Sequence, residues 1–573
     1  MKADLTRNTF DPLKHFTRVL MQQGRVQLDS DWNEQAAILL RYLRTMGADV
    51  IGPAGGPDSL AFSVAPLPVA SDFGIGLGHY YVAGILCEAD AGAIPVVASA
   101  GIPNEVTVAQ WTLDGREFEE NQLVELFDEV AQPFATPGFP PVVTQIATAS
   151  QANCKLTFAP AVDISKGINP SIRRVLTYLT QPDLPQADPL TPTAGANGAY
   201  LAYLDVWERH ITCIEDGAIR EVALGGPDTA TRSKIVWQVK VVKGKVKDPN
   251  NGKPCDGFTP DDDKFFPNLF GPNHGLLKAR ALRKAASTDP CIIAPDANYH
   301  GAENQLYRVE VHTPGAAAEV PPVVEVNRGR VAKAKAITGA TFKWSRENGS
   351  VTFPIVGPIS TGNGQTILTL ASLGRDHRFG LSAENWVEIQ DDDYVLRNRA
   401  GNLLQVQSID RSRLQVTLSG TADADVGVDA SKHPLLRRWD YEAGDPAEGG
   451  LTLGPDKAAF IQESDGDLWL SLENGVEIQF EPAPPGKAQQ YRTGDYWLIP
   501  ARTATADVEW PTETVTDMQG NTATTPLARP PLGIQHHYAP LGAITVDSSG
   551  KVTVAADKQN SCRKQFKSVT SLS

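Results

Sequence analysis

The residues that could do chemistry in this 573-residue chain are spread along it, and their spacing favours structural roles. Histidines are densest at His536-His537-Tyr538, but neighbouring residues on a strand point to opposite faces, which makes a two-ligand metal site awkward. The acidic runs Asp391-Asp392-Asp393 and Glu463-Ser-Asp465-Gly-Asp467 offer the oxygen ligands that calcium prefers. Neither run fits the twelve-residue EF-hand loop. We therefore favour acidic turns over calcium sites, and we expect no metal ion and no cofactor.

The signatures of several large enzyme classes do not occur in the sequence. There is no G-x-x-x-x-G-K-[ST], H-E-x-x-H or G-x-S-x-G motif, and no strand-linked G-x-G-x-x-G motif. Their absence disfavours phosphoryl transfer, zinc proteolysis and α/β-hydrolase chemistry. The paired carboxylates of a glycosidase follow no local spacing rule, so a carbohydrate-active enzyme or a cargo protein stays a minor alternative. We predict no enzymatic activity and no catalytic residues.

Three tryptophans are candidates for stacking on a sugar ring. Trp344 lies in the run Lys343-Trp-Ser-Arg-Glu-Asn-Gly349, where Arg346 and Glu347 could hydrogen-bond a glycan, and Trp386 and Trp510 are further candidates. The competing interpretation is a buried tryptophan followed by a polar hairpin turn, and we favour it for Trp344. A glycan- or cell-surface-binding protein is therefore the alternative function.

The bulk composition limits the class of partner. The net charge of −15 repels phosphate backbones and anionic lipid, so we expect neither nucleic acid nor a membrane as partner. No apolar stretch approaches the ~18 residues that a membrane span needs, and the opening MKADLTRNTFDP lacks the apolar core of a signal peptide. We expect synthesis in the cytoplasm, with an extracellular location only as part of a released particle. The six cysteines form no C-x-x-C pair, and we expect them to be reduced.

One amphipathic helix is predicted near the start of the chain. Asp31 is a candidate N-cap, Glu34 has the capping-box spacing, and Gly52-Pro53 ends the helix. A short arm, residues 1–30, precedes it. The helix could cap the following domain or dock on a partner. Its apolar residues recur at helical intervals: Trp32, Ala36, Leu39, Leu43, Met46 and Val50.

Strand-like runs dominate the rest of the chain. They predict a mainly β protein of multi-domain β-sandwich or β-barrel-like modules, preceded by the N-terminal arm and amphipathic helix. Short helices are expected near 122–130, 171–178 and 275–286, and Asn474-Gly475 predicts a tight hairpin. The expected division is an arm and anchoring helix (1–57), a first β-domain (58–165), a Pro/Gly-rich connector (166–198), a second β-domain (199–334) with an irregular insertion (245–296), and C-terminal β-modules (335–573).

Several blocks of sequence resemble an uncharacterised family of bacterial proteins. They include Lys2-Ala-Asp-Leu-Thr-Arg7, Leu204-Asp-Val-Trp-Glu-Arg-His210, Phe342-Lys-Trp-Ser-Arg-Glu-Asn-Gly-Ser350 and Gly533-Ile-Gln-His-His-Tyr-Ala-Pro-Leu541, and they span nearly the whole chain. Members of this family are often found with contractile injection systems and other phage-tail-like machines. About the first 90 residues, with Trp32-Asn-Glu34 leading into a helix and the later Tyr81-Val-Ala-Gly84, also resemble tail-fibre and baseplate-associated proteins of contractile-tail phages.

The resemblance implies a non-catalytic structural or adaptor component of a phage-tail-like contractile particle, in a baseplate, fibre or peripheral position. Its partners would be other subunits of that particle, and the arm and helix would anchor it. We recognise no heptad or fibre repeat, so a homo-oligomer is left open. The candidate partner-binding residues are Phe10, Phe16, Trp32, Leu39, Leu43 and Met46.

Overall fold

The structure is a computed structural model, and it is mainly β, with 42% strand against 9% helix, which confirms the predicted fold class. It contains many sheets and a small closed barrel, so the protein is β-rich and multi-domain. The described residues are 1–57, 60–99, 102–129, 139–193, 198–246, 258–260, 274–281, 298–318, 338–376, 378–446, 449–466, 468–483, 489–516, 520, 522–554 and 562–566. Most of the expected insertion 245–296 lies outside them.

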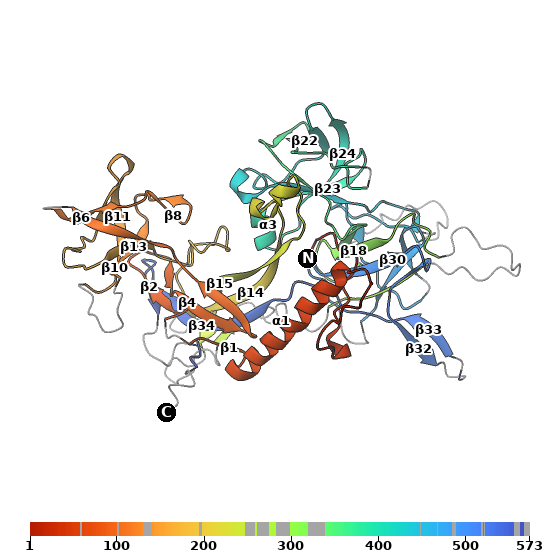
Figure 1. Cartoon of the computed structure of the whole chain (residues 1–573), viewed down its shortest axis with the longest axis horizontal. Coiled ribbons are helices and arrows are strands. Elements are labelled where there is room, and N and C mark those ends of the chain that lie inside the picture. Colours follow the sequence, from red (N-terminus) through yellow and green to blue (C-terminus); the bar gives the residue numbers. More distant parts are fainter. Residues whose placement is uncertain are drawn as a thin grey trace, which may run out of the picture. The chain divides into compact units, whose positions relative to one another are not determined.

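The chain forms two compact units, and each is discontinuous in sequence. Unit 1 consists of Met1–Arg41, Glu208–Lys234 and Phe266–Gln535, and unit 2 of Tyr42–Trp207, Ile235–Phe265 and His536–Ser573. The expected division was linear, whereas the chain here returns to each unit twice. Three elements that are labelled in Figure 1 contribute residues to both units: helix α1 (Asp29–Ile51) and strands β14 (Gly198–Ile211) and β15 (Arg232–Val246).

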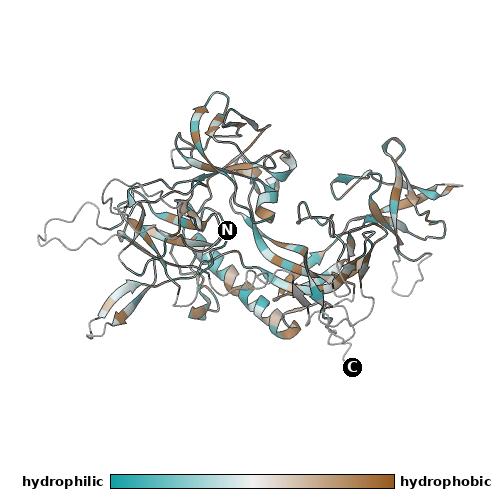
Figure 2. Ribbon diagram, turned by 180° about the vertical axis from the view of Figure 1, so that it is seen from behind, coloured by the Kyte–Doolittle hydropathy of each residue, from teal (hydrophilic) through white to brown (hydrophobic). Residues whose placement is uncertain are grey.

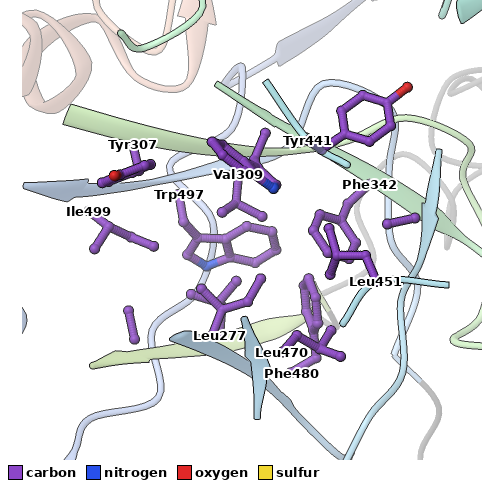
Figure 3. Packing of buried hydrophobic residues seen from close by; sticks show 14 of the residues in the cluster. Leu277, Tyr307, Val309, Phe342, Tyr441, Leu451, Leu470, Phe480, Trp497 and Ile499 are labelled. Carbon is purple, nitrogen blue, oxygen red and sulfur yellow. The ribbon is translucent and has the colours of Figure 1, made fainter. Parts of the chain in front are cut away.

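The largest core of unit 1 lies between two antiparallel sheets. Figure 3 shows the indole of Trp497 packed among Val309, Leu277 and the aromatic side chains around them. Tyr307 and Trp344 meet edge to face in the same core, with ring centroids 5.8 Å apart. One sheet has the order β27 (Ala459–Phe460), β19 (Thr341–Ser345), β18 (Gln305–Val311), β30 (Tyr496–Arg502) and β31 (Asp507–Val508), and the other has the order β17 (Leu276–Ala281), β29 (Val476–Glu481) and β28 (Leu470–Glu473).

A seven-stranded sheet forms a second core in unit 1. Its core residues include Phe353, Val387 and Leu436, and the short helix α3 (Asp392–Leu396) follows β23. The sheet order is β20 (Thr352–Pro354), β26 (Leu435–Trp439), β23 (Trp386–Gln390), β24 (Leu403–Asp410), β25 (Gln415–Ser419), β22 (Gln365–Thr369) and β21 (Ser360–Gly362). The two-stranded hairpin of β32 (Thr512–Thr516) and β33 (Thr522–Pro526) also belongs to unit 1.

Unit 2 contains a closed barrel, smaller sheets and most of a five-stranded sheet. The barrel order is β10 (Leu123–Asp128), β11 (Val142–Ser150), β12 (Lys155–Ala159), β7 (Ile102–Val108), β6 (Ala93–Ser99) and β13 (Pro170–Arg174). The five-stranded sheet has the order β16 (Phe258–Pro260), β15, β14, β34 (His537–Val546) and β35 (Val552–Val554). A three-stranded sheet joins β1 (Ala54–Gly55), β4 (Gly78–Val82) and β5 (Ile85–Ala89), and β2 (Val64–Pro66) pairs with β3 (Phe73–Ile75) and β8 (Thr112–Leu113) with β9 (Arg116–Glu117).

The three short helices predicted at 122–130, 171–178 and 275–286 are wrong where the structure describes them. The first two regions hold strands β10 and β13, which pair with each other in the barrel. The third holds β17, and residues 282–286 lie outside the described residues. In β10 and β17 every second residue is buried, which is the two-residue period of a half-buried strand. The hairpin predicted at Asn474-Gly475 is confirmed, because both residues have positive φ between β28 and β29.

Helix α1 begins two residues before the predicted cap. The carboxylate of Asp29 accepts a hydrogen bond of 2.9 Å from the backbone N–H of Thr6, and Asp31 lies within the first turn. Such acidic residues stabilise the positive end of the helix dipole. The helix ends at Ile51, and Gly52 follows with φ +95°, a left-handed conformation that favours glycine. No helix among the described residues has the length and apolarity to cross a membrane.

Candidate partner-binding surface

The first three residues of the arm are bound to the rest of unit 1 by polar contacts, and Ala3 is buried. The ammonium of Lys2 donates to Glu310 Oε1 at 2.9 Å. The carbonyl of Met1 accepts from Arg308 Nη1 at 3.3 Å, and that of Ala3 accepts from the side chain of Asn348 at 2.8 Å. Backbone and charge, rather than apolar side chains, therefore fix this end of the arm.

Lys2 lies at the edge of a group of charges that we call the ionic cluster, whose other members are buried: Lys2, Arg308, Glu310, Lys343 and Glu388. Lys343 Nζ lies 2.6 Å from Glu388 and 3.9 Å from Glu310, and Arg308 Nε lies 2.6 Å from Glu310. Burial lowers the pKa of Lys2 to about 7, although the nearby carboxylate of Glu310 acts to raise it. Burial would raise the pKa of Glu388, but the adjacent ammonium of Lys343 lowers it to about 2. The carboxylates are therefore charged at neutral pH.

The middle of the arm is tied to the first turns of α1. Besides the contact between Thr6 and Asp29, the hydroxyl of Thr9 donates to Glu34 Oε2 at 2.6 Å. The backbone N–H of Val19 donates to Gln35 Oε1 at 2.8 Å. The polar residues at the start of α1 therefore hold the arm, and these contacts use no apolar side chain of the arm.

Near its C-terminal end, α1 packs closely on the turn between β4 and β5. A Cβ added to Gly47 would lie 3.2 Å from Gly84 Cα, and one added to Gly84 would lie 2.0 Å from the carbonyl oxygen of Arg44. Gly84 also has φ +75°. Only glycine fits this turn, which gives the Tyr81-Val-Ala-Gly84 segment a structural role.

The apolar stripe of α1 points to solvent. Trp32 is 69% exposed and Leu43 is 58% exposed, whereas the buried residues of α1 are Ser30 and Ile38. Brown and teal residues are mixed along α1 in Figure 2. The helix therefore does not cap a domain with this stripe. We call the following residues the α1 face, all of them exposed: Trp32, Ala36, Leu39, Leu43, Met46 and Val50.

The arm adds apolar surface that the sequence analysis missed. Of the two predicted arm residues, Phe16 is exposed and Phe10 is half-buried. A further group of exposed apolar residues follows Pro12, and it has no regular spacing that could have revealed it. We call this group, with Phe16, the arm face: Leu13, Phe16, Leu20, Met21, Val26 and Leu28.

The three candidate sugar-stacking tryptophans do not form an open platform. Trp344 is buried in the core of unit 1, so its ring is not available to a glycan at the surface. Trp386 is half-buried and stacks on Tyr441, with centroids 5.8 Å apart and planes at 9°. Trp510 is half-buried, and its N–H donates to the Leu527 carbonyl at 2.9 Å. Packing positions all three rings.

The histidines and acidic runs have structural partners. His536 Nδ1 lies 2.7 Å from Asp205, and Asp391 caps α3 by accepting from the Tyr394 N–H at 3.1 Å. In the part of the chain that the structure describes, no three His, Cys, Asp or Glu residues are placed to hold a metal ion. The last residue of the second acidic run, Asp467, lies outside that part. Cys562 is disulfide-bonded, which corrects the expectation that all six cysteines are reduced.

One cavity in unit 1, of about 350 Å³, carries opposite charges. Arg346 Nη2 lies 2.6 Å from Glu473, and Arg378 pairs with Glu347 at 2.5 Å and with Glu303. Each charge is thus already neutralised by a neighbour, which leaves little to attract a ligand. The arm face and the α1 face are the stronger candidate for function.

The comparisons with known proteins identify the family and nothing more specific. No curated protein and no solved structure matches the chain. One family model, described as a family of unknown function (DUF6519), matches residues 1–130, 175–250 and 273–569. The match includes the arm, α1, Gly84 and the ionic cluster, and it omits part of the barrel. Because it covers most of the sequence, the chain belongs to the family of unknown function DUF6519.

Proposed function

We propose that this protein is a non-catalytic assembly component that docks on neighbouring protein subunits through its arm and helix α1. The resemblance noted in the sequence makes a phage-tail-like contractile particle the setting to test, in a baseplate, fibre or peripheral position. The observation that carries the proposal is the exposed apolar surface of the arm face and the α1 face.

The arm face and the α1 face expose large apolar side chains to water. Soluble monomers rarely expose contiguous apolar patches above a few hundred Å². Burying such surface is worth roughly 25 cal/mol per Å². A single exposed leucine is ordinary, but a group of large exposed apolar side chains on one arm and one helix needs an explanation. A protein partner that covers them supplies one.

The way the arm is held also supports docking. Ordering a free segment during association costs binding energy, and a segment held in place beforehand avoids part of that cost. The ionic cluster and the threonine contacts to α1 fix the arm without burying its face. The arm is therefore preorganised for a partner.

The test is co-sedimentation with sheathed particles from a cell that makes both. Wild-type chain should travel with sheath and tube proteins at a fixed ratio. Leu20→Asp places a charge on the arm face, where Leu20 is 68% exposed, and should release the chain from the particles. Leu224→Asp is the matched control, because Leu224 is 67% exposed in a different segment of unit 1.

Two outcomes would contradict the proposal in different ways. Wild-type chain that stays in the soluble fractions would remove the particle as the setting. A Leu20→Asp chain that sediments as well as the Leu224→Asp control would remove the arm as the docking element. Far-UV circular dichroism should be equal for the variants, since both positions are exposed.

A further inference from the structure

The exposed residues of α1 have the spacing of a coiled-coil seam. From Trp32 to Val50 the α1 face alternates steps of four and three residues, which is the a/d pattern of a heptad. We recognised no heptad from the sequence, because the same residues also fit an ordinary helical period. The seam extends over ~27 Å at 1.5 Å per residue. Its partner should be another α-helix, since a heptad seam is shaped for knobs-into-holes packing.

We propose that the occupant of this seam is α1 of a second copy of the chain, packed antiparallel about a two-fold axis near residue 41. The inference deepens the proposed function and rests on it, because it takes α1 as a docking surface and names what covers it. The arm face is then left for other subunits.

Side-chain size along the seam favours the antiparallel arrangement. Around residue 41, two-fold symmetry places residue 32 opposite 50, 36 opposite 46, and 39 opposite 43. The largest side chain, Trp32, then meets the smaller Val50, and Ala36 meets the long Met46. A parallel pair in register would instead put tryptophan on tryptophan and alanine on alanine, which combines overpacking with a void.

The flanking positions favour a second copy over an unrelated helix. In the antiparallel pair, Leu40 and Tyr42 each approach their own symmetry mates, and both are exposed apolar residues. Gln35 approaches Asp49 of the other copy. No like charges face each other at these positions, so self-association carries no repulsion that would exclude it. Apolar flanks at the symmetry axis also widen the buried stripe.

Helices in proteins owe most of their stability to tertiary packing rather than to the intrinsic propensity of their residues. Here α1 is already held by the Gly47–Gly84 contact and by the buried side chain of Ile38. Each half of α1 thus has a packing contact of its own, and part of the cost of forming the helix is met before pairing.

Light scattering after size exclusion tests the inference over a range of concentrations. The full chain should have twice its 61.6 kDa mass. Leu43→Asp should raise the dimer Kd at least about 100-fold, because two-fold symmetry removes two buried leucines. Thr45→Asp changes an exposed residue outside the seam and should remain dimeric.

The register has its own test. A mixture of Leu43→Asp chains and Leu39→Lys chains should regain the dimer, because antiparallel pairing brings residues 43 and 39 together. Parallel pairing keeps them apart, so a mixture that stays monomeric overturns the arrangement. A monomeric wild-type chain overturns the dimer itself. If that monomer still sediments with particles while Leu20→Asp does not, the proposed function survives and only this inference fails.

Discussion

Replacing Lys2 by methionine should change how the stability of unit 1 depends on pH. The Lys2 ammonium bonds Glu310 at 2.9 Å and lies 5.5 Å from the centre of the Trp439 ring. Burial lowers its pKa to about 7, against 10.5 for an ordinary lysine. Between these pH values the unfolded chain binds a proton that the folded protein does not, so stability rises with pH in this window. Below about pH 7 the cost of the buried charge is fully present.

The size of this pH dependence follows from the pKa shift of Lys2 and from the exposed fraction of its side chain. A separation between about 7 and 10.5 corresponds to on the order of 5 kcal/mol, at about 1.4 kcal/mol per pH unit. The Lys2 side chain keeps 22% of its exposure, so water screens part of this cost. We therefore expect wild type to gain on the order of 2 kcal/mol between pH 7 and pH 9.5 relative to Lys2→Met.

Urea unfolding followed by tryptophan fluorescence measures this difference, because Trp439 is buried beside Lys2 in unit 1. Taking the difference in unfolding free energy between wild type and Lys2→Met cancels the contributions of the other groups that titrate in the same pH range. Lys14→Met is the matched control, since Lys14 is exposed on the same arm, and it should follow wild type at every pH. If Lys2→Met keeps the wild-type pH dependence, Lys2 is not buried in the ionic cluster as described.

Two further substitutions test the supports of the arm and helix. Gly84→Ala should lower the free energy of unfolding by several kcal/mol, because the new Cβ would overlap the Arg44 carbonyl. Gly115→Ala is the control and should cost about 1 kcal/mol, because Gly115 has φ +73° but open space around it. Equal melting temperatures of the two variants by circular dichroism would contradict the close packing at Gly84. Glu388→Gln should cost about 3–5 kcal/mol at pH 7 by leaving Lys343 without its buried carboxylate, while the exposed Glu384→Gln should change little. The stability that Glu388→Gln lacks relative to wild type should shrink as pH falls from 4.5 towards 2, because wild type loses the stabilising charge of this carboxylate over that range. A difference in unfolding free energy that stays constant with pH, measured by urea unfolding, would refute the assignment of this stability to the ion pair.

The parts of the structure that the sequence predicts are local. The hairpin at Asn474-Gly475 follows from turn chemistry, and the helix that ends before Gly52-Pro53 follows from period and capping, with its start displaced by two residues. β10 was assigned wrongly, because a six-residue run with four apolar residues is too short to distinguish a helix from a strand, and pairing within the barrel decides it. The residues of the α1 face could be found because amphipathic spacing is visible, but their exposure and most of the arm face could not.

The ionic cluster lay beyond sequence analysis for a different reason. It joins Lys2 to Glu310 across 308 positions and Lys343 to Glu388 across 45, and no spacing rule connects such residues. The discontinuous units have the same origin, since the chain leaves and re-enters each of them twice. Contacts of this kind depend on the completed fold, so one sequence without relatives does not reveal them.

The nature of these supports bears on why the arm can act as a docking element. A buried ion pair is a costly way to stabilise a fold, and well-packed apolar residues often do as well or better. An arm held by its own apolar side chains would have to bury Phe16, Leu20 and Met21 to stay in place. Held instead by Lys2, by backbone carbonyls and by the Asp29 carboxylate, it keeps those side chains outside. Polar attachment thus lets one segment be fixed and still offer an apolar face.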